Sequence, residues 1–174
     1  GAVPTLSLAQ NTLLTRTGTV ERSGWIRTAE VTQLAQDLIK RFNVKAGGPQ
    51  AAAKSLSGGN LQKFIVGREI DANPKLLIVS QPTWGVDVGA AAQIRQALID
   101  LAAGGVAVLV VSEELDELFE ICDRLAVIAQ GRLAEARPTS ETNAEEIGLL
   151  MSGSFIAAGA HSERTFSPAG AIDA

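Results

Sequence analysis

The chain has 174 residues, of which 46% are hydrophobic, and its formal net charge is −4. This length can bury the core of one domain, and the acidic balance, with a pI near 5.0, gives no broad basic surface for nucleic acid. The single cysteine, Cys122, excludes an internal disulfide, and no apolar run approaches the roughly 18 residues that span a membrane.

The first part of the chain carries helical patterns. Residues 6–14 predict a short helix, and residues 16–27 are polar and irregular. Thr28 is expected to cap an amphipathic helix, because apolar residues recur after it at three- and four-residue spacing until the Gly-Pro break at residues 46–49. A Gly-rich turn then begins another helix over residues 58–72.

The second part of the chain alternates between strand and helix patterns. Such alternation is typical of a parallel α/β sheet, and a hairpin around Gln130-Gly131-Arg132 predicts an antiparallel edge. Residues 152–174 are rich in Ala, Gly and Ser and predict a disordered tail. The expected strands are 75–79 and 106–111, which their length and apolar composition predict to be buried, and 124–129 and 133–136. The expected helices are 89–103, 113–122 and 143–151.

The most informative stretch is Leu56-Ser57-Gly58-Gly59-Asn60, which we call the signature segment. A helix start leaves about four N–H groups unpaired and carries roughly half a positive charge. Glycines let a phosphate approach that backbone, and Ser57 adds a hydroxyl at a capping position. A bare Ser-Gly-Gly is also consistent with a capped helix after a turn, so the residues that follow decide its interpretation.

Those residues carry a family resemblance. Gln62, Lys63 and Arg68 are followed by the apolar run and polar end of residues 76–83, and then by Gly85-Val86-Asp87 and by residues 110–114. In this order they resemble the signature helix, Walker B strand, D-loop and H-loop of the ATP-binding cassette family. The signature segment is similar to that family's LSGGQ motif, with Asn60 in place of the last Gln. The resemblance covers residues 1 to about 151.

The resemblance implies a partial P-loop NTPase fold of the α/β class. Residues 1–72 would form the helical subdomain and residues 73–151 the RecA-like part, with the tail at 152–174. No Gly-x-x-x-x-Gly-Lys-Ser/Thr pattern occurs, so the loop that holds the β- and γ-phosphates, the Walker A region, is missing. The chain therefore resembles the part of a cassette that follows the Q-loop, and we expect it to bind ATP poorly, and to be inactive, on its own.

Three positions depart from the family pattern. Ser80 and Gln81 stand where the Walker B strand ends in Asp-Glu, and Glu113 stands in place of the H-loop histidine. Ser80 brings no negative charge to a magnesium shell, Gln81 cannot accept a proton, and Glu113 is an anion where a phosphate would lie. We interpret this as a degenerate nucleotide site, with no catalytic residue intact in cis and no metal ligand.

The resemblance also implies partners. Cassettes pair head to tail, so Ser57, Gly58, Gly59 and Asn60 would contact ATP in trans, held with Mg by another cassette. Asp87 would make a D-loop contact across that interface, or serve only as the acid at a helix N-terminus. The departures resemble the second cassette of tandem sugar and nucleoside importers, which implies a partner cassette in the same polypeptide, membrane permease subunits, and a peripheral location at the cytoplasmic face of the membrane.

Two alternatives remain open at this point. One is a soluble, non-transport ATPase of the same family, and the other is a non-catalytic regulatory or interaction domain that keeps only the fold. We also expect self-association, because the strand at 76–79 lacks its usual neighbours. Trp84 could stack at a cassette interface, although simple packing explains it at least as well. Trp25 could contact a permease, but local packing is the favoured interpretation.

Overall fold

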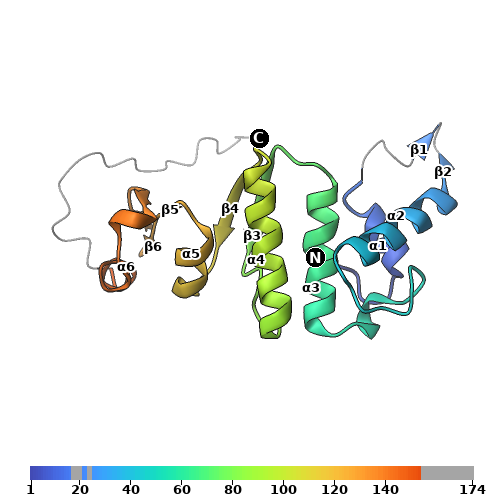
Figure 1. Cartoon of the computed structure of the whole chain (residues 1–174), viewed down its shortest axis with the longest axis horizontal. Coiled ribbons are helices and arrows are strands. Elements are labelled where there is room, and N and C mark those ends of the chain that lie inside the picture. Colours follow the sequence, from blue (N-terminus) through green and yellow to red (C-terminus); the bar gives the residue numbers. More distant parts are fainter. Residues whose placement is uncertain (17–20, 23–24, 154–174) are drawn as a thin grey trace, which may run out of the picture. The chain divides into compact units, whose positions relative to one another are not determined.

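The computed structural model describes residues 1–16, 21–22 and 25–153. The chain divides into two compact units, Gly1–Cys122 and Asp123–Ala174 (Figure 1). The expected disordered tail lies outside the described residues except at 152 and 153. Subdomain boundaries after residues 72 and 151 stay a prediction.

The first unit begins with a small helical layer. Helix α1 starts in a capping box, in which Ser7 Oγ accepts from the Gln10 N–H and the Gln10 side chain accepts from the Ser7 N–H. The sequence placed the next cap at Thr28, but the N-cap is Arg27 and makes no side-chain capping bond. The elements are α1 (Leu8–Leu13), β1 (Glu21–Arg22), β2 (Trp25–Ile26), α2 (Thr28–Arg41), the 3-10 helix η1 (Ala53–Ser55) and α3 (Gly58–Asp71).

The short ladder of β1 and β2 was not expected, since residues 16–27 carry no alternating apolar pattern. The main apolar core of the helical layer lies between α1, α2 and α3. Helices α2 and α3 approach closely because Gly67 has no side chain, and a Cβ there would overlap the ring of Phe42. The buried core residues are Leu8, Leu38, Ile39, Val44, Ala53 and Phe64.

A parallel strand pair follows. Strand β3 (Leu76–Ser80) pairs in parallel with β4 (Ala107–Val111), in a register that runs from Leu76↔Ala107 to Ser80↔Val111. Helix α4 (Val88–Ala103) connects them, and α5 (Leu115–Ile121) follows β4. Leu77 is buried against α3 and α4, which forms the second apolar core of this unit.

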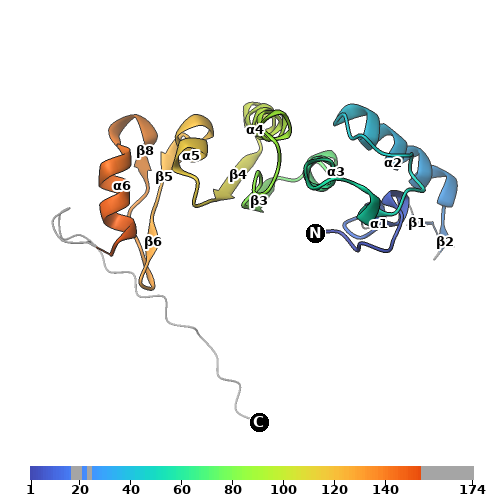
Figure 2. The ribbon, with the colours of Figure 1, turned by 90° about the horizontal axis from the view of Figure 1, so that it is seen from below.

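The opposite face of the β3–β4 pair is open, whereas the sequence predicted buried strands. Ile78 is 61% exposed and Leu109 is 52% exposed. Figure 2 shows α4 on one side of the pair and no described element of the same unit on the other. These strands therefore carry apolar side chains on a face that no described residue of this unit covers.

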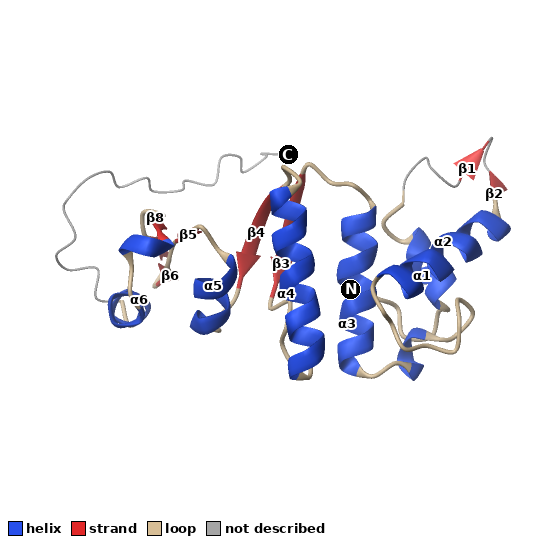
Figure 3. Cartoon of the chain, viewed as in Figure 1, coloured by secondary structure: helices blue, strands red, loops and turns tan. Residues whose placement is uncertain are grey.

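The described residues of the second unit form short antiparallel ladders, a 3-10 helix and an α-helix (Figure 3). The hairpin is confirmed at Gln130 and Gly131, whose φ angles are 50° and 74°, as a tight turn of this hand requires. Among the described strands, none of these pairs with β3 or β4, so the expected antiparallel edge forms separate sheets. The elements are β5 (Arg124–Leu125) with β8 (Arg137–Pro138), β6 (Ile128–Ala129) with β7 (Arg132–Leu133), the 3-10 helix η2 (Thr139–Glu141) and α6 (Ala144–Met151).

Within the part of the chain that the structure describes, no helix combines the length and apolar character needed to cross a membrane.

Candidate functional site

The signature segment forms the start of α3, as predicted. Ser57 is the N-cap, and its carbonyl accepts the first backbone bond of the helix, from the Leu61 N–H (2.9 Å). The amides of Gly58 and Gly59 come before that bond and therefore have no acceptor within the helix. Ser57 and Gly58 are exposed, and the first turn contains no acidic residue. This end of α3 thus combines free amides, the positive end of a dipole and a backbone without side chains.

Asn60 holds the cap residue in place. Its side-chain Nδ2 donates to Ser57 Oγ (2.8 Å), while its Oδ1 accepts from the Lys45 N–H (2.8 Å). The Asn60 backbone N–H also points to Ser57 Oγ, at 3.5 Å. Asn60 therefore connects the serine hydroxyl to the loop that follows α2, which restricts the rotamers of Ser57.

The signature segment lies against the beginning of α4. A Cβ on Gly59 would stand 3.0 Å from Ala90 Cβ and 3.1 Å from Asp87 Oδ2, and a Cβ on Gly58 would stand 3.4 Å from the Gly85 carbonyl oxygen. The structure therefore brings the two predicted segments, 57–60 and 85–87, into contact. Gly59 is buried in this contact and leaves no room for a side chain.

Asp87 is the N-cap of α4, with Oδ1 accepting from the Ala90 N–H (2.9 Å). In the structure Asp87 therefore acts as a helix cap. Its contact with another cassette stays a prediction. The carboxylate stands next to Gly59, but its charge faces the positive end of the α4 dipole, which offsets it.

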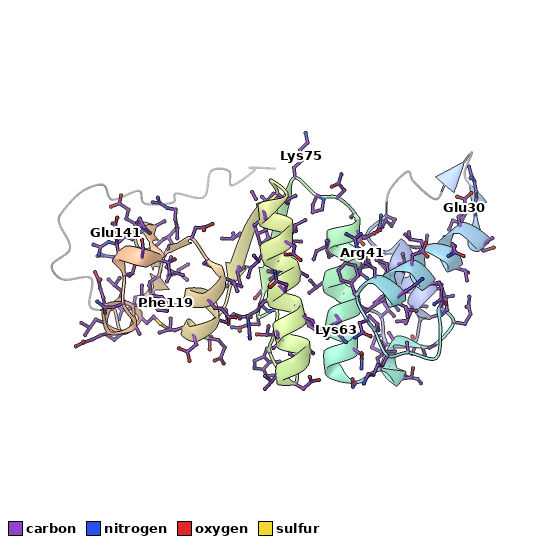
Figure 4. The ribbon with its side chains drawn as sticks, in the orientation of Figure 1. Glu30, Arg41, Lys63, Lys75, Phe119 and Glu141 are labelled. Carbon is purple, nitrogen blue, oxygen red and sulfur yellow. The ribbon has the colours of Figure 1, made fainter. Side chains whose placement is uncertain are left out.

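Two buried cationic side chains of α3 bond to neighbouring segments and hold the helix in place. Lys63, labelled in Figure 4, is 9% exposed, and its Nζ donates to the Asn43 carbonyl (2.6 Å) and to Gln93 Oε1 (3.3 Å). Arg68 is 1% exposed, and its guanidinium donates to the Asn11 carbonyl (3.0 Å) and the Gly1 carbonyl (2.9 Å). Both side chains are committed to internal acceptors, so they position the signature helix.

The three positions that depart from the family pattern lie at one edge of the parallel pair. Ser80 ends β3, Gln81 follows it, and Glu113 follows the end of β4 two residues after Val111. The Gln81 N–H donates to the Val111 carbonyl (2.7 Å) and continues the ladder, and Gln81 adopts φ = 49°. The carboxyl ends of the two parallel strands meet here.

The same edge contains a carboxylate that the sequence analysis missed. Glu117 on α5 is 4% exposed, accepts from Thr83 Oγ1 at Oε1 (2.7 Å), and accepts from Ser112 Oγ at Oε2 (3.1 Å). The signal that could have found it is a pair of hydroxyl residues, one just beyond each strand, which converge where neighbouring parallel strands end. The sequence does not distinguish Glu117 from the other acidic residues of the same helix.

This edge does not fit a magnesium–nucleotide complex held in cis. Ser80 offers a neutral hydroxyl and Gln81 a neutral amide, whereas magnesium prefers carboxylate and phosphate oxygens. Among the described residues, no group of three or more His, Cys, Asp or Glu side chains is placed to hold a metal ion. The buried Glu117 already accepts two hydroxyl donors.

Of the two tryptophans, only Trp84 has a side chain that the structure describes. Trp84 is 77% exposed in the loop between β3 and α4, so its side chain is not packed locally among the described residues. Trp25 lies in β2, and its side chain is outside the described residues.

A pocket of about 510 Å³ lies between the end of α2, α3 and α4. Phe42 and Val66 line it together with Lys63, and none of the predicted site residues contributes to it. It is therefore separate from both the signature segment and the strand ends.

Comparison with known proteins gives a consistent family of relatives. The chain is 44% identical over 137 residues to the nucleoside import ATP-binding protein NupA of Lactococcus lactis subsp. cremoris, which covers 79% of this chain and 27% of that protein. It is 38% identical over 148 residues to the ribose import ATP-binding protein RbsA 2 of Rhizobium meliloti, covering 85% and 29%. The chain thus spans less than a third of the length of these relatives.

Among solved structures, a dimeric post-hydrolysis state of the ATP-binding cassette MJ0796 bound to ADP and Pi superposes with a TM-score of 0.64. It is 22% identical and covers 80% of this chain and 59% of that chain, which establishes the shared fold. No protein-family model matches the chain.

Proposed function

Because the chain belongs to the ATP-binding cassette family, as a relative of importer ATP-binding proteins, we propose that it is part of the ATP-binding subunit of an ABC importer. Within that subunit, Ser57, Gly58, Gly59 and Asn60 would bind the γ-phosphate of an ATP held by another cassette. The chain would contribute to ATP hydrolysis in trans, and alone it would be inactive.

The observation that carries this proposal is the form of the α3 start. Ser57 and Gly58 are exposed, Gly58 and Gly59 put no side chain in the way, and Asn60 fixes the hydroxyl of Ser57 by a 2.8 Å bond. A phosphate that reached this end from a facing molecule would meet several donors at once, with the helix dipole in favour. In the proposed head-to-tail pairing, the facing cassette holds that phosphate on its own P-loop.

The cassette's own site would support binding better than hydrolysis. Ser80 and Gln81 supply neither a general base next to an attacking water nor an anionic ligand for magnesium, and Glu113 places an anion where a phosphate would lie. ATP and Mg would therefore act in the complete assembly, where the intact site belongs to the other cassette.

Several features of the whole protein follow as proposals. The departures at positions 80, 81 and 113 favour a tandem arrangement, with this chain in the second of two cassettes. Its subdomains would divide near residues 72 and 151, with the tail from 152. The names of the relatives favour nucleosides or ribose as the transported solute. Permease subunits would hold the protein at the cytoplasmic face of the membrane, and Asp87 would face the partner cassette.

The proposal can be tested by uptake into vesicles that contain the complete importer. Uptake of labelled guanosine and of labelled ribose would be measured with and without Mg-ATP on the side of the ATP-binding subunit. We expect ATP-dependent uptake of one of the two solutes. If the protein associates with no permease and its ATPase activity is independent of a membrane complex, a non-transport ATPase replaces this proposal.

A further inference from the structure

We propose that the pocket between the end of α2, α3 and α4 binds a small amphipathic carboxylate. Lys63 would hold the carboxylate group, and an apolar wall of α3 and α4 would hold the body of the ligand. The pocket lies within the first unit, Gly1–Cys122, and is separate from the signature segment and from the strand ends. The inference concerns the folded chain and does not rest on the proposed function.

The size of the pocket suits a small ligand. Its volume of about 510 Å³ lies within the roughly 300–1,000 Å³ that is usual for small-molecule sites. Helix α3 lines it with Lys63, Val66 and Ile70, which recur at three- and four-residue spacing and therefore share one face of the helix. The rise of an α-helix places the two ends of this lining roughly 10 Å apart. The α3 wall thus has a cation at one end and an aliphatic side chain at the other.

Two helices give the pocket its apolar wall. Val66 and Ile70 of α3 belong to the second apolar core of the unit, and α4 adds Ile94, Ala97 and Leu101. A hydrocarbon body placed against this wall would be removed from water together with the side chains that it covers. Its binding would therefore be stabilised by the hydrophobic effect.

Lys63 is a buried cation that lacks a matching anion. The residue is 9% exposed, and its Nζ donates to two neutral acceptors, the Asn43 carbonyl (2.6 Å) and Gln93 Oε1 (3.3 Å). An ammonium group has three N–H donors, so one remains for a further acceptor. Among the described residues, no carboxylate forms an ion pair with this nitrogen. Because a buried charge is costly unless it is paired, a ligand carboxylate would supply the missing counter-charge.

The other charges around the pocket also favour an anion. Arg41 lines the pocket and pairs with Asp71 (3.0 Å), but Asp71 also pairs with Arg16 (2.6 Å), so two cations share one carboxylate. The lining includes one acid, Asp100, which is exposed and accepts from Gln96 Nε2 (2.8 Å). Two cations and one carboxylate therefore line this pocket in a chain whose net charge is −4, which makes the pocket a local site for negative charge.

Octanoate, a linear carboxylate, is the probe for this site. Its binding to the full chain would be measured by isothermal titration calorimetry and located by the amide shifts of a ¹⁵N-labelled sample. We expect saturable binding at one site, with the largest shifts at Val66 and Ala97. The uncharged 1-octanol should bind at least roughly tenfold more weakly, because it cannot pair with Lys63.

Two variants with matched controls assign the binding to the pocket. Lys63→Met removes the charge and should weaken octanoate binding at least roughly tenfold, with binding of 1-octanol unchanged. Lys75→Met removes the same charge at an exposed position outside the pocket and should leave both affinities unchanged. Ala97→Phe should fill the pocket and abolish binding, whereas Ala102→Phe, at an exposed position of the same helix outside the pocket, should not.

If Lys63→Met fails to fold, Ala97→Phe and the comparison with 1-octanol decide the question. The open face of the β3–β4 pair is the competing site for an apolar probe, so shifts confined to Ile78 and Leu109 would overturn the proposal. Absence of octanoate binding, equal affinities for octanoate and 1-octanol, or binding that survives Ala97→Phe would overturn it as well.

Discussion

Ser57→Arg is expected to lower the ATPase rate of the complete importer protein by roughly 100-fold or more, which is the scale of losing a donor to a transferring phosphate. Ser57 is exposed at the start of α3, and its hydroxyl is held by Asn60. An arginine there would remove the hydroxyl and fill the space beside Gly58 and Gly59 that the phosphate needs. Steady-state phosphate release, with saturating Mg-ATP, measures the effect.

Ser140→Arg is the matched control, since Ser140 is exposed in the 3-10 helix η2 and receives the same new side chain. It should leave the ATPase rate unchanged. Because Ser57 caps α3, Ser57→Arg should cost about 1 kcal/mol of stability, so the ATPase rates are compared at a temperature where both variants are folded. Normal ATPase and transport by Ser57→Arg would show that the signature segment has no role at the phosphate.

Arg68→Ala is expected to lower the free energy of unfolding by about 3 kcal/mol, because it opens a cavity and leaves buried carbonyls without their donor. The guanidinium is 1% exposed and bonds to Asn11, Gly1 and Glu69. These bonds connect α3 to α1 and to the beginning of the chain. Urea unfolding of the full chain, followed by far-UV circular dichroism, measures the loss.

Arg41→Ala provides the comparison. Arg41 pairs with Asp71 at 3.0 Å, but its side chain is 61% exposed, so its removal should cost at most about 0.5 kcal/mol. Arg68→Lys separates charge from shape: a lysine keeps the charge and cannot reach all three partners, so an intermediate loss is expected. Equal losses for Arg41→Ala and Arg68→Ala would contradict the assigned role of Arg68.

The sequence predicted the elements whose patterns are local. The cap at Ser57, the helix that follows it and the turn at Gln130-Gly131 are all confirmed, because each depends on a few adjacent residues with a specific backbone requirement. Asp87 at the start of α4 belongs to the same group. The fold class also followed, since five motifs occur in the order typical of one family.

Features that depend on distant contacts could not be predicted in this way. Glu117 has no unusual sequence context, and its burial results from the convergence of Thr83 and Ser112 at the strand ends. The strands of the parallel pair read as fully buried by composition, yet the face with Ile78 is open among the described residues of its unit. Composition reports how apolar a strand is and carries no information about what covers each face.

The central claim, that the signature segment acts on an ATP held elsewhere, is tested most directly by photolabelling of the complete protein with an ATP analogue that carries an aryl azide on the γ-phosphate. Trypsin cleaves after Lys54 and Lys63, so a peptide of residues 55–63 contains the whole exposed start of α3. The account predicts label in this peptide, and predicts its loss when the P-loop lysine of the other cassette is replaced. Absence of label from residues 55–63, or label that persists without that lysine, would contradict it.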